Sequence, residues 1–307
     1  MTATILSENV IFGLPSASGV EIIGSTAYII GDDSPYLYRL DAATLTPLEP
    51  VRLFDTKHFD DGRISKKRKS DLECMVALTW PDGRSGLLLL GSGSRPTRDR
   101  AWFVPTDGAV PGLPEAVDLT VLYGHLRAYL PAGVPLNLEA AATTATELLL
   151  FQRTVGRADA ALLFVLPLGT VLRLLAGEAG ASVPVPHQLV FQLPLIDGCA
   201  AGFSGATFVD GRLFVSASVE NTSDAVLDGE VLGSFVGMVD MVAQTATFAR
   251  LVWADGRAYV GKVEGLAMRK FLGAGRWELL LVTDDDAGGS TIVVANLVLE
   301  SVADATW

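Results

Sequence analysis

The sequence predicts an all-β fold, a β-propeller in which five four-stranded blades form a ring within a single domain over residues 1–307. Three observations lead to this prediction. A short phrase, in which a turn and a small or acidic residue precede an apolar strand, recurs five times at intervals of about 52 to 66 residues. Most intervals hold four short apolar stretches separated by turn residues. Half of the residues are hydrophobic, and Gly and Pro are plentiful, as many short buried strands require.

The five copies of the phrase set the register of the expected blades. They are Ser18-Gly-Val-Glu21, Ser70-Asp-Leu-Glu73, Leu136-Asn-Leu-Glu139, Gly202-Phe-Ser204-Gly and Lys262-Val-Glu264-Gly. The first blade is expected to use strands at residues 21–23, 27–30, 36–41 and 48–54, and the second at 72–79, 86–90, 101–105 and 116–123. The fourth blade repeats the pattern at 205–209, 213–218, 235–242 and 246–253.

The last interval has only three strands, at residues 266–269, 277–283 and 291–298. A spare apolar segment at residues 3–12 is expected to complete this blade, since closing the ring removes exposed sheet edges. Six blades are the alternative, if residues 131–186, with an extra apolar run at 170–176, contain another blade. The leucine-rich run at 162–175 is interpreted as strand rather than helix, because Pro167 and Gly169 interrupt it.

Composition excludes several classes of function. A net charge of −12 and a pI of about 4.7 argue against nucleic acid or an anionic membrane as the main partner. Cys74 and Cys199 are interpreted as two buried small hydrophobic residues rather than a disulfide. No secretory signal and no apolar run of membrane-spanning length is recognisable, so a cytoplasmic protein is expected.

Two sets of polar residues are expected to share one rim of the ring, because the start of the first strand in a hairpin lies beside the end of the second. The first set is the repeated acid of the phrase, with Ser204 in its place in the fourth blade. The second set follows the next strand of each blade. The sets are Glu21, Glu73, Glu139, Ser204 and Glu264, and Asp32, Asp33, Ser94, Arg95, Gln152, Arg153, Glu220, Asn221, Asp284, Asp285 and Asp286.

Carboxylates crowded at a channel mouth need neutralisation, since like charges raise one another's pKa and a poorly solvated ion costs several kcal/mol. A divalent cation such as Ca²⁺ suits them, because it binds several carboxylate and carbonyl oxygens. The predicted metal ligands are Glu21, Glu73, Glu139, Glu264 and Asp284. Arg95 and Arg153 could supply part of the neutralising charge instead. In the structural alternative, each glutamate only accepts hydrogen bonds from the backbone of the neighbouring turn.

A basic cluster, Lys66-Lys-Arg-Lys69, precedes the second copy of the phrase. It is either a solvated loop or a border of the mouth that, with Arg95, Arg98, Arg100 and Arg153, attracts a small anionic molecule. Arg98, Asn221 and Asp285 are the predicted ligand-binding residues.

Four short segments carry a resemblance to known proteins. They are Asp71-Leu-Glu73, Asn137-Leu-Glu139, Val263-Glu264-Gly-Leu-Ala267 and the strand ending in Thr283-Asp-Asp-Asp286. In these segments the chain resembles the phytase-like and SdiA-regulated bacterial β-propellers. The resemblance implies a five- or six-bladed ring with calcium at or near the channel and, in the phytase branch, hydrolysis of phosphate esters. Glu21, Asn221 and Asp284 are also similar in residue type to the metal-binding trio of gluconolactonase-type lactonases.

The function expected from these features is hydrolysis of an anionic ester or a lactone at the channel mouth. The predicted catalytic residues are Glu73, Glu139, Arg95 and Arg153. The ion would polarise the substrate and activate a water molecule, a glutamate would act as general base, and the arginines would bind the negative group. The alternative is a non-catalytic binding module whose glutamates brace the blades, because propellers host both kinds of function.

Overall fold

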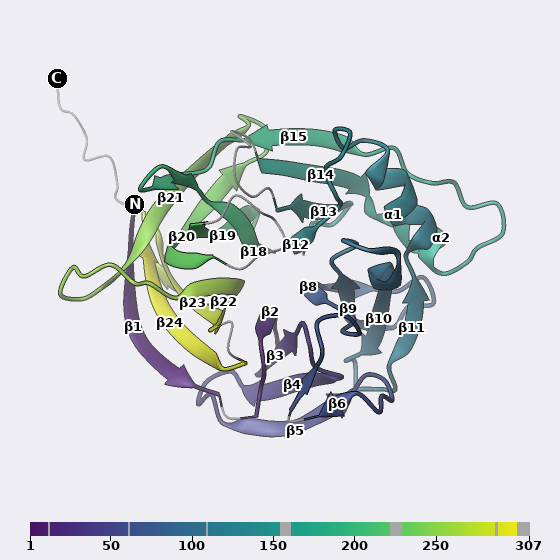
Figure 1. The fold of residues 1–307 in the computed structure, drawn as a ribbon, viewed down its shortest axis with the longest axis horizontal. Helices are drawn as coiled ribbons and strands as arrows, with labels where there is room; N and C mark the ends of the chain where they lie inside the picture. Colours follow the sequence, from purple (N-terminus) through teal and green to yellow (C-terminus); the bar gives the residue numbers. More distant parts are fainter. Residues whose placement is uncertain are drawn as a thin grey trace.

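The computed structural model of the chain describes residues 1–11, 13–60, 62–108, 110–153, 161–221, 229–285 and 288–299. In this part of the chain the fold is all-β with a few short helices, and the sheets are arranged radially around a central axis (Figure 1). Three sheets have four strands each, one has eight, and two are short two-stranded ribbons. The described helices are each too short to cross a membrane.

The three four-stranded sheets run outward from the axis in sequence order. The first contains β2 (Ala17–Ile23), β3 (Thr26–Gly31), β4 (Tyr36–Asp41) and β5 (Pro47–Arg52). The second contains β8 (Leu72–Thr79), β9 (Ser85–Gly91), β10 (Arg100–Pro105) and β11 (Glu115–Asp118). The third contains β12 (Leu138–Thr143), β13 (Glu147–Gln152), β14 (Ala161–Pro167) and β15 (His187–Phe191). The ribbons are β6 (Phe59–Asp60) with β7 (Arg63–Ile64), and β16 (Leu195–Ile196) with β17 (Cys199–Ala200).

The eight-stranded sheet has the order β18 (Gly202–Val209), β19 (Arg212–Asn221), β20 (Glu230–Asp240), β21 (Thr245–Trp253), β1 (Thr2–Val10), β24 (Ser290–Val298), β23 (Arg276–Asp284) and β22 (Lys262–Gly273). It consists of two four-stranded parts, β18 to β21 and β22 to β24 with β1, which are joined by pairing of their outer strands β21 and β1. The N-terminal strand β1 pairs antiparallel with β24, as the sequence predicted. It also pairs in parallel with β21 through residues Ala3, Thr4 and Ile5, which the sequence did not predict.

Two segments expected to be strands contain helices. The strand predicted at residues 116–123 ends at Asp118, whose carboxylate accepts a hydrogen bond from the Thr120 amide at 2.8 Å. Helix α1 (Thr120–Arg127) follows and buries Leu122, Tyr123 and Leu126 on one face. The run at 162–175 is strand β14 and then helix α2 (Leu168–Leu175). The extra apolar run at 170–176 therefore lies mostly in a helix and supplies no strand for another sheet. A single 3-10 turn, η1 (Pro96–Arg98), follows β9.

Five strands form the inner wall of the ring. β2, β8, β12, β18 and β22 contact one another in a closed cycle, each touching the next and β22 returning to β2. The hydrophobic core lies between neighbouring sheets. Leu87 to Leu90 of β9, for example, are all buried, because both faces of that sheet are covered. Cys74 and Cys199 are both unpaired, but only Cys74 is buried as expected, and Cys199 is partly exposed.

Every inner strand carries a β-bulge near its start. The unpaired residues at the five bulges are Ser18, Glu73, Glu139, Ser204 and Glu264. A bulge inserts one residue that has no partner on the neighbouring strand and re-aims its side chain. Each copy of the repeated phrase therefore contains a bulged residue, and the side chains of four of these five residues line the mouth of the channel.

Candidate functional site at the channel mouth

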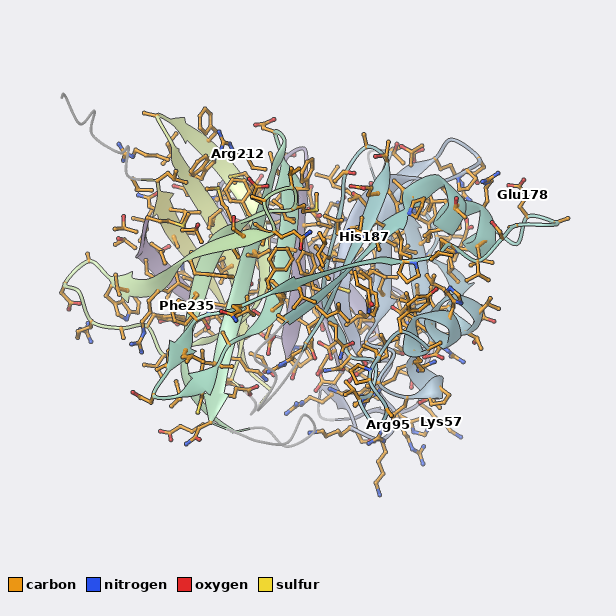
Figure 2. The ribbon with its side chains drawn as sticks, turned by 90° about the horizontal axis from the view of Figure 1, so that it is seen from above. Lys57, Arg95, Glu178, His187, Arg212 and Phe235 are labelled. Carbon is orange, nitrogen blue, oxygen red and sulfur yellow. The ribbon has the colours of Figure 1, made fainter. Side chains whose placement is uncertain are left out.

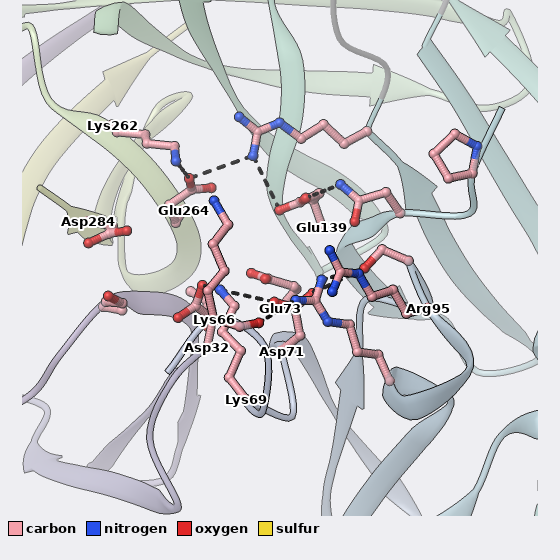
Figure 3. Close-up of a pocket in the computed structure, with 18 residues that line it drawn as sticks. Asp32, Lys66, Lys69, Asp71, Glu73, Arg95, Glu139, Lys262, Glu264 and Asp284 are labelled. Carbon is pink, nitrogen blue, oxygen red and sulfur yellow. Dashed lines mark hydrogen bonds and ion pairs between the residues drawn. The ribbon is translucent and has the colours of Figure 1, made fainter. Parts of the chain in front are cut away.

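A cavity of about 150 Å³ lies where the inner strands begin and the second strands end (Figure 3). This is the shared rim that the hairpin argument predicted. Its acidic lining residues are Asp32, Asp71, Glu73, Glu139, Glu264 and Asp284, and its basic lining residues are Lys66, Lys69, Arg95, Arg98, Arg153 and Lys262. The remaining lining residues are Ser16, Ala17, Ser18, Ser94, Pro135 and Asn137. Acidic and basic side chains are thus equal in number around the described part of the cavity.

The first copy of the phrase contributes Ser18 to the mouth rather than Glu21. The bulge in β2 lies between Ala17 and Gly19, and Glu21 follows three residues later, about 10 Å further along the strand. The backbone amides of Ile22 and of Ala77 in β8 partly oppose the rise that burial causes in the pKa of its carboxyl. Glu21 does not line the cavity, so the structure separates it from the other predicted metal ligands.

The channel narrows sharply below this cavity. A Cβ atom on Gly265 would lie 2.9 Å from the Gly19 Cα atom, and one on Gly205 would lie 2.9 Å from the Leu266 amide nitrogen. These contacts need glycine, because the inner strands approach too closely for a side chain. The space beyond is only about 10 Å³, close to the smallest volume that holds one water molecule. The cavity is therefore a pocket entered from the mouth.

One side of the pocket holds the carboxylates of Asp32, Asp71 and Glu73. Single oxygens of the three all lie within 4.8 Å of one another. Lys69 forms ion pairs with Asp32 and, at 3.0 Å, with Asp71. Arg98 lies 2.6 Å from the other Asp71 oxygen. No hydrogen bond or ion pair joins the Glu73 carboxyl to any described residue.

The other side holds Glu139 of β12 and Glu264 of β22, and Arg153 and Lys262 connect them to Glu220 of β19, which does not itself line the pocket. Arg153 pairs with all three, closest to Glu220, at 3.5 Å from Glu139 and at 3.9 Å from Glu264. The Lys262 amine lies 3.3 Å from Glu220 and 3.0 Å from Glu264. Glu139 also accepts a hydrogen bond from the Asn137 side chain at 2.5 Å. Arg153 therefore joins strands from three successive parts of the ring.

Burial shifts the pKa values of the pocket carboxyls. It raises the pKa of Glu139 to about 7, with Arg153 opposing the rise. Burial, and then the neighbouring Glu139 and Asp71 carboxylates, hold the pKa of Glu73 well above its ordinary value. Glu139 therefore titrates near neutral pH, and Glu73 keeps its proton to a higher pH than an ordinary glutamate does. Two titratable carboxyls with raised pKa values in one pocket suit the roles of proton donor and proton acceptor.

A wider basin of about 760 Å³ adjoins the mouth. It shares Asp32, Lys66, Lys69, Lys262 and Asp284 with the pocket. The residues that it adds are Asp33, His58, Arg63, Ile64, Ser65 and Arg68. The basin has more basic than acidic lining residues, although the whole chain carries a charge of −12. The positive charge of this basin would attract an anion to this end of the ring.

The remaining predicted residues are divided between the rim and the periphery. Asp284 lines the pocket, and Arg95 lies exposed on its edge, at the same end of the ring as Lys57 and opposite Arg212 (Figure 2). Asn221 and Asp285 are exposed and do not line the pocket. The Glu21, Asn221 and Asp284 trio is therefore not assembled. Asp286 lies outside the described residues.

The sequence placed Glu220 on the rim without giving it a role, and it did not single out Lys69, Asp71 or Lys262 as site residues. The signals were present, since Asp71 and Lys262 belong to copies of the phrase and Lys69 ends the basic cluster. Lys69 pairs with Asp32, 37 positions earlier, and Arg153 with Glu220, 67 positions later. Only the closed ring brings such distant positions together.

A divalent ion at Asp32, Asp71 and Glu73 would have suitable oxygen ligands. However, Ca²⁺ requires about six to eight oxygens, and the Lys69 amine already lies between two of these three carboxylates. A second cation there would be repelled by the ammonium group. The triad as arranged therefore does not fit a resident ion, and no catalytic step is derived through one.

Residues 13–297 match the model of a family described as a family of unknown function, DUF6929. That description names no activity, so the resemblance to phytase-like and SdiA-regulated propellers stays a prediction. A search of curated proteins found no match.

Similar solved structures include glutaminyl cyclase from Myxococcus xanthus, with 12% identity, a TM-score of 0.48 and coverage of 97% of this chain and 98% of that one. The arabinanase Arb43A from Bacillus subtilis has 10% identity, a TM-score of 0.43 and coverage of 93% and 95%. The Cps50 (Swd1) β-propeller domain from Myceliophteria thermophila has 11% identity, a TM-score of 0.39 and coverage of 95% and 99%. At these scores we draw nothing about activity from them.

Proposed function

The chain belongs to the DUF6929 family, and we propose that it is a hydrolase of small anionic esters or lactones that uses the channel-mouth pocket for acid–base chemistry. The observation that carries this proposal is the Glu73 carboxyl. It is partly buried, has no hydrogen bond or ion pair with the described residues and lines the same pocket as Glu139. A carboxyl left without partners in a charged pocket is available to a ligand.

We also infer that the ring has five blades in one domain, with the eight-stranded sheet counting as two. The closed cycle of contacts among five inner strands supports this count, as does one bulge in each of them. A five-fold arrangement explains why residues from all parts of the chain converge on one pocket.

In the proposed reaction, protonated Glu73 donates a proton to the leaving oxygen of the substrate. Ionised Glu139 takes a proton from the attacking water. The Arg95 guanidinium and the Lys66 amine lie exposed at the rim and would bind the anionic group, while the basin would attract it. Arg153 pairs with Glu139 and would hold that carboxylate in place.

The pH dependence follows from these pKa values. Activity should rise as the pH increases through about 7, because Glu139 must be ionised to act as base. It should fall again at higher pH, as Glu73 loses its proton. Hydrolysis of 4-nitrophenyl phosphate and of an aliphatic lactone, measured across pH 5 to about 10, tests this bell-shaped profile.

Glu73→Gln and Glu139→Gln should each reduce the turnover rate by about 100-fold or more, the usual contribution of a positioned acid or base. Glu178→Gln is the matched control, since Glu178 is exposed outside the ring, far from the pocket (Figure 2). It should leave the rate unchanged. Equal rates in all four proteins would contradict the proposal.

The second candidate function is a non-catalytic binding module, and the Arg153 hub favours it. Arg153 holds glutamates of three strands in ion pairs, which braces the ring at the mouth. Under this alternative, no substrate of either class is hydrolysed, and Glu139→Gln loses thermal stability because it breaks an ion pair with Arg153, whereas Glu73→Gln breaks none and melts as the unaltered chain does. Melting curves recorded beside the kinetics therefore separate the two functions.

A further inference from the structure

Lys69 lies in the position that a metal ion would take among the carboxylates of the mouth (Figure 3). Its side chain is only 12% exposed. Its amine pairs with Asp32 and Asp71, two members of the triad whose oxygens lie within 4.8 Å of one another. The Asp32 and Asp71 carboxylates raise the pKa of Lys69 despite its burial, so the amine stays charged.

The backbone holds Lys69 in this place. The amides of Arg68 and Lys69 both donate hydrogen bonds to the Ser65 carbonyl, at 2.8 and 3.0 Å, which forms a tight turn just before β8. The Lys66 carbonyl of the same turn accepts a hydrogen bond from Arg98 at 3.3 Å. The turn that carries Lys69 is therefore held by hydrogen bonds, and it fixes the point from which the side chain extends to the carboxylates.

The Lys69 amine does not satisfy every oxygen of the triad. The Asp32 Oδ1 atom is buried and has no hydrogen-bond partner in the described part of the chain. The Glu73 carboxyl has none there either. Burying such oxygens without a partner is costly, and once the Lys69 amine is removed a divalent cation is the ligand that would satisfy them.

We propose that Lys69 is a built-in cation that replaces a divalent ion at the channel mouth, and that removing its amine converts Asp32, Asp71 and Glu73 into a divalent-cation site. This deepens the proposed function, because it makes the hydrolase independent of metal. The readout is metal binding rather than turnover, so failure of one proposal is distinguishable from failure of the other.

The experiment compares the full chain with the Lys69→Ala variant, each stripped with EDTA and then titrated with CaCl₂. For the unaltered chain, the melting temperature should be the same in EDTA and in about 1 mM Ca²⁺, and calorimetry should detect no binding at the mouth. For Lys69→Ala, Ca²⁺ should raise the melting temperature by about 3 °C or more, with one ion bound per chain.

Lys67→Ala is the matched control, since Lys67 is an exposed lysine of the same cluster that lines neither the pocket nor the basin. It should behave as the unaltered chain. If Lys69→Ala does not fold without an ion, Lys69→Gln keeps most of the side-chain length and is titrated in its place.

Two results would overturn the proposal. The first is stoichiometric Ca²⁺ binding by the unaltered chain that Asp71→Asn abolishes, because the site would then accept an ion beside Lys69. The second is a folded Lys69 variant that gains no Ca²⁺ response, because the triad would then lack the geometry of a cation site.

Discussion

At the scale of single residues, the prediction for Glu21 was wrong because its position in the repeated phrase suggested a place at the channel mouth. Glu21 ends the first copy of the repeated phrase, yet Ser18 occupies the bulge. Ser18 donates a hydrogen bond of 2.5 Å to the Leu72 carbonyl of the next inner strand, a structural role. Burial raises the pKa of Glu21 to about 8, away from the pocket.

This pKa predicts a pH-dependent stability. Between the unfolded pKa near 4.5 and the folded value of about 8, the folded state binds more protons, so the Glu21 contribution falls as the pH rises. Glu21→Gln should therefore leave stability at pH 4 unchanged and increase it at pH 8 by at least about 1.4 kcal/mol, the equivalent of one pKa unit. Urea unfolding at both pH values measures the difference. Glu49→Gln, at an exposed position in β5, should show no such gap.

At the scale of elements, the inner strands determine the site. A bulge points one polar side chain of each strand toward the mouth or its wall, and the small residue after it lets neighbouring strands approach. The small residues are Gly19, Cys74, Ala140, Gly205 and Gly265. The pattern of polar then small residue in the phrase therefore has a packing cause as well as a chemical one.

Gly265→Ala tests this close approach. The added Cβ would lie 2.8 Å from the Val282 Cγ2 atom and 2.9 Å from the Gly19 Cα atom, which belongs to backbone that cannot move freely. The substitution should lower the free energy of unfolding by about 1–3 kcal/mol. Gly124→Ala in helix α1 is the control, because beyond the backbone of its own helix nothing lies within 4 Å of the added Cβ. It should be neutral or stabilising, since alanine is the better helix former. Equal effects of both would count against the packing account.

At the scale of the whole molecule, the N-terminal strand joins the ends of the chain. β1 pairs with β24 on one side and with β21 on the other, so no outer edge remains open between these sheets. Ala3 and Ile5 pack into a core with Leu251 and Leu297. Closure of the ring therefore depends on apolar contacts as well as on backbone pairing.

Adjacent residues of β1 separate these contributions. Ile5 is 2% exposed and Leu6 is 50% exposed. Ile5→Ala should destabilise the chain by about 2–4 kcal/mol, because it leaves a cavity in the core between two sheets. Leu6→Ala should change stability by less than about 0.5 kcal/mol. Thermal and urea unfolding of both variants measure the contrast, and a similar loss in both would argue that strand pairing, rather than core packing, dominates closure.

The fold and the site were predictable to different degrees. Strands β8 to β10 and β18 to β21 follow the expected strands closely, because alternating apolar residues and turn signals are local properties of the chain. The helix at Thr120–Arg127 was missed because its leucines suit a strand as well as a helix. Glu73, Glu139, Glu264, Arg153 and Asp284 were correctly placed together, because the hairpin rule fixes which strand ends share a rim.

The sequence by itself determined the all-β fold, most of its strands and the convergence of acidic residues at one mouth. Tertiary structure alone decided which charges meet. Lys69, Lys262 and Arg153 neutralise carboxylates that lie elsewhere in the chain, and the bulge in β2 selects Ser18 over Glu21. Strand formation depends on neighbours a few residues away in the sequence. Coulomb attraction depends on distance in space, and these charges come close to one another only when the ring has closed.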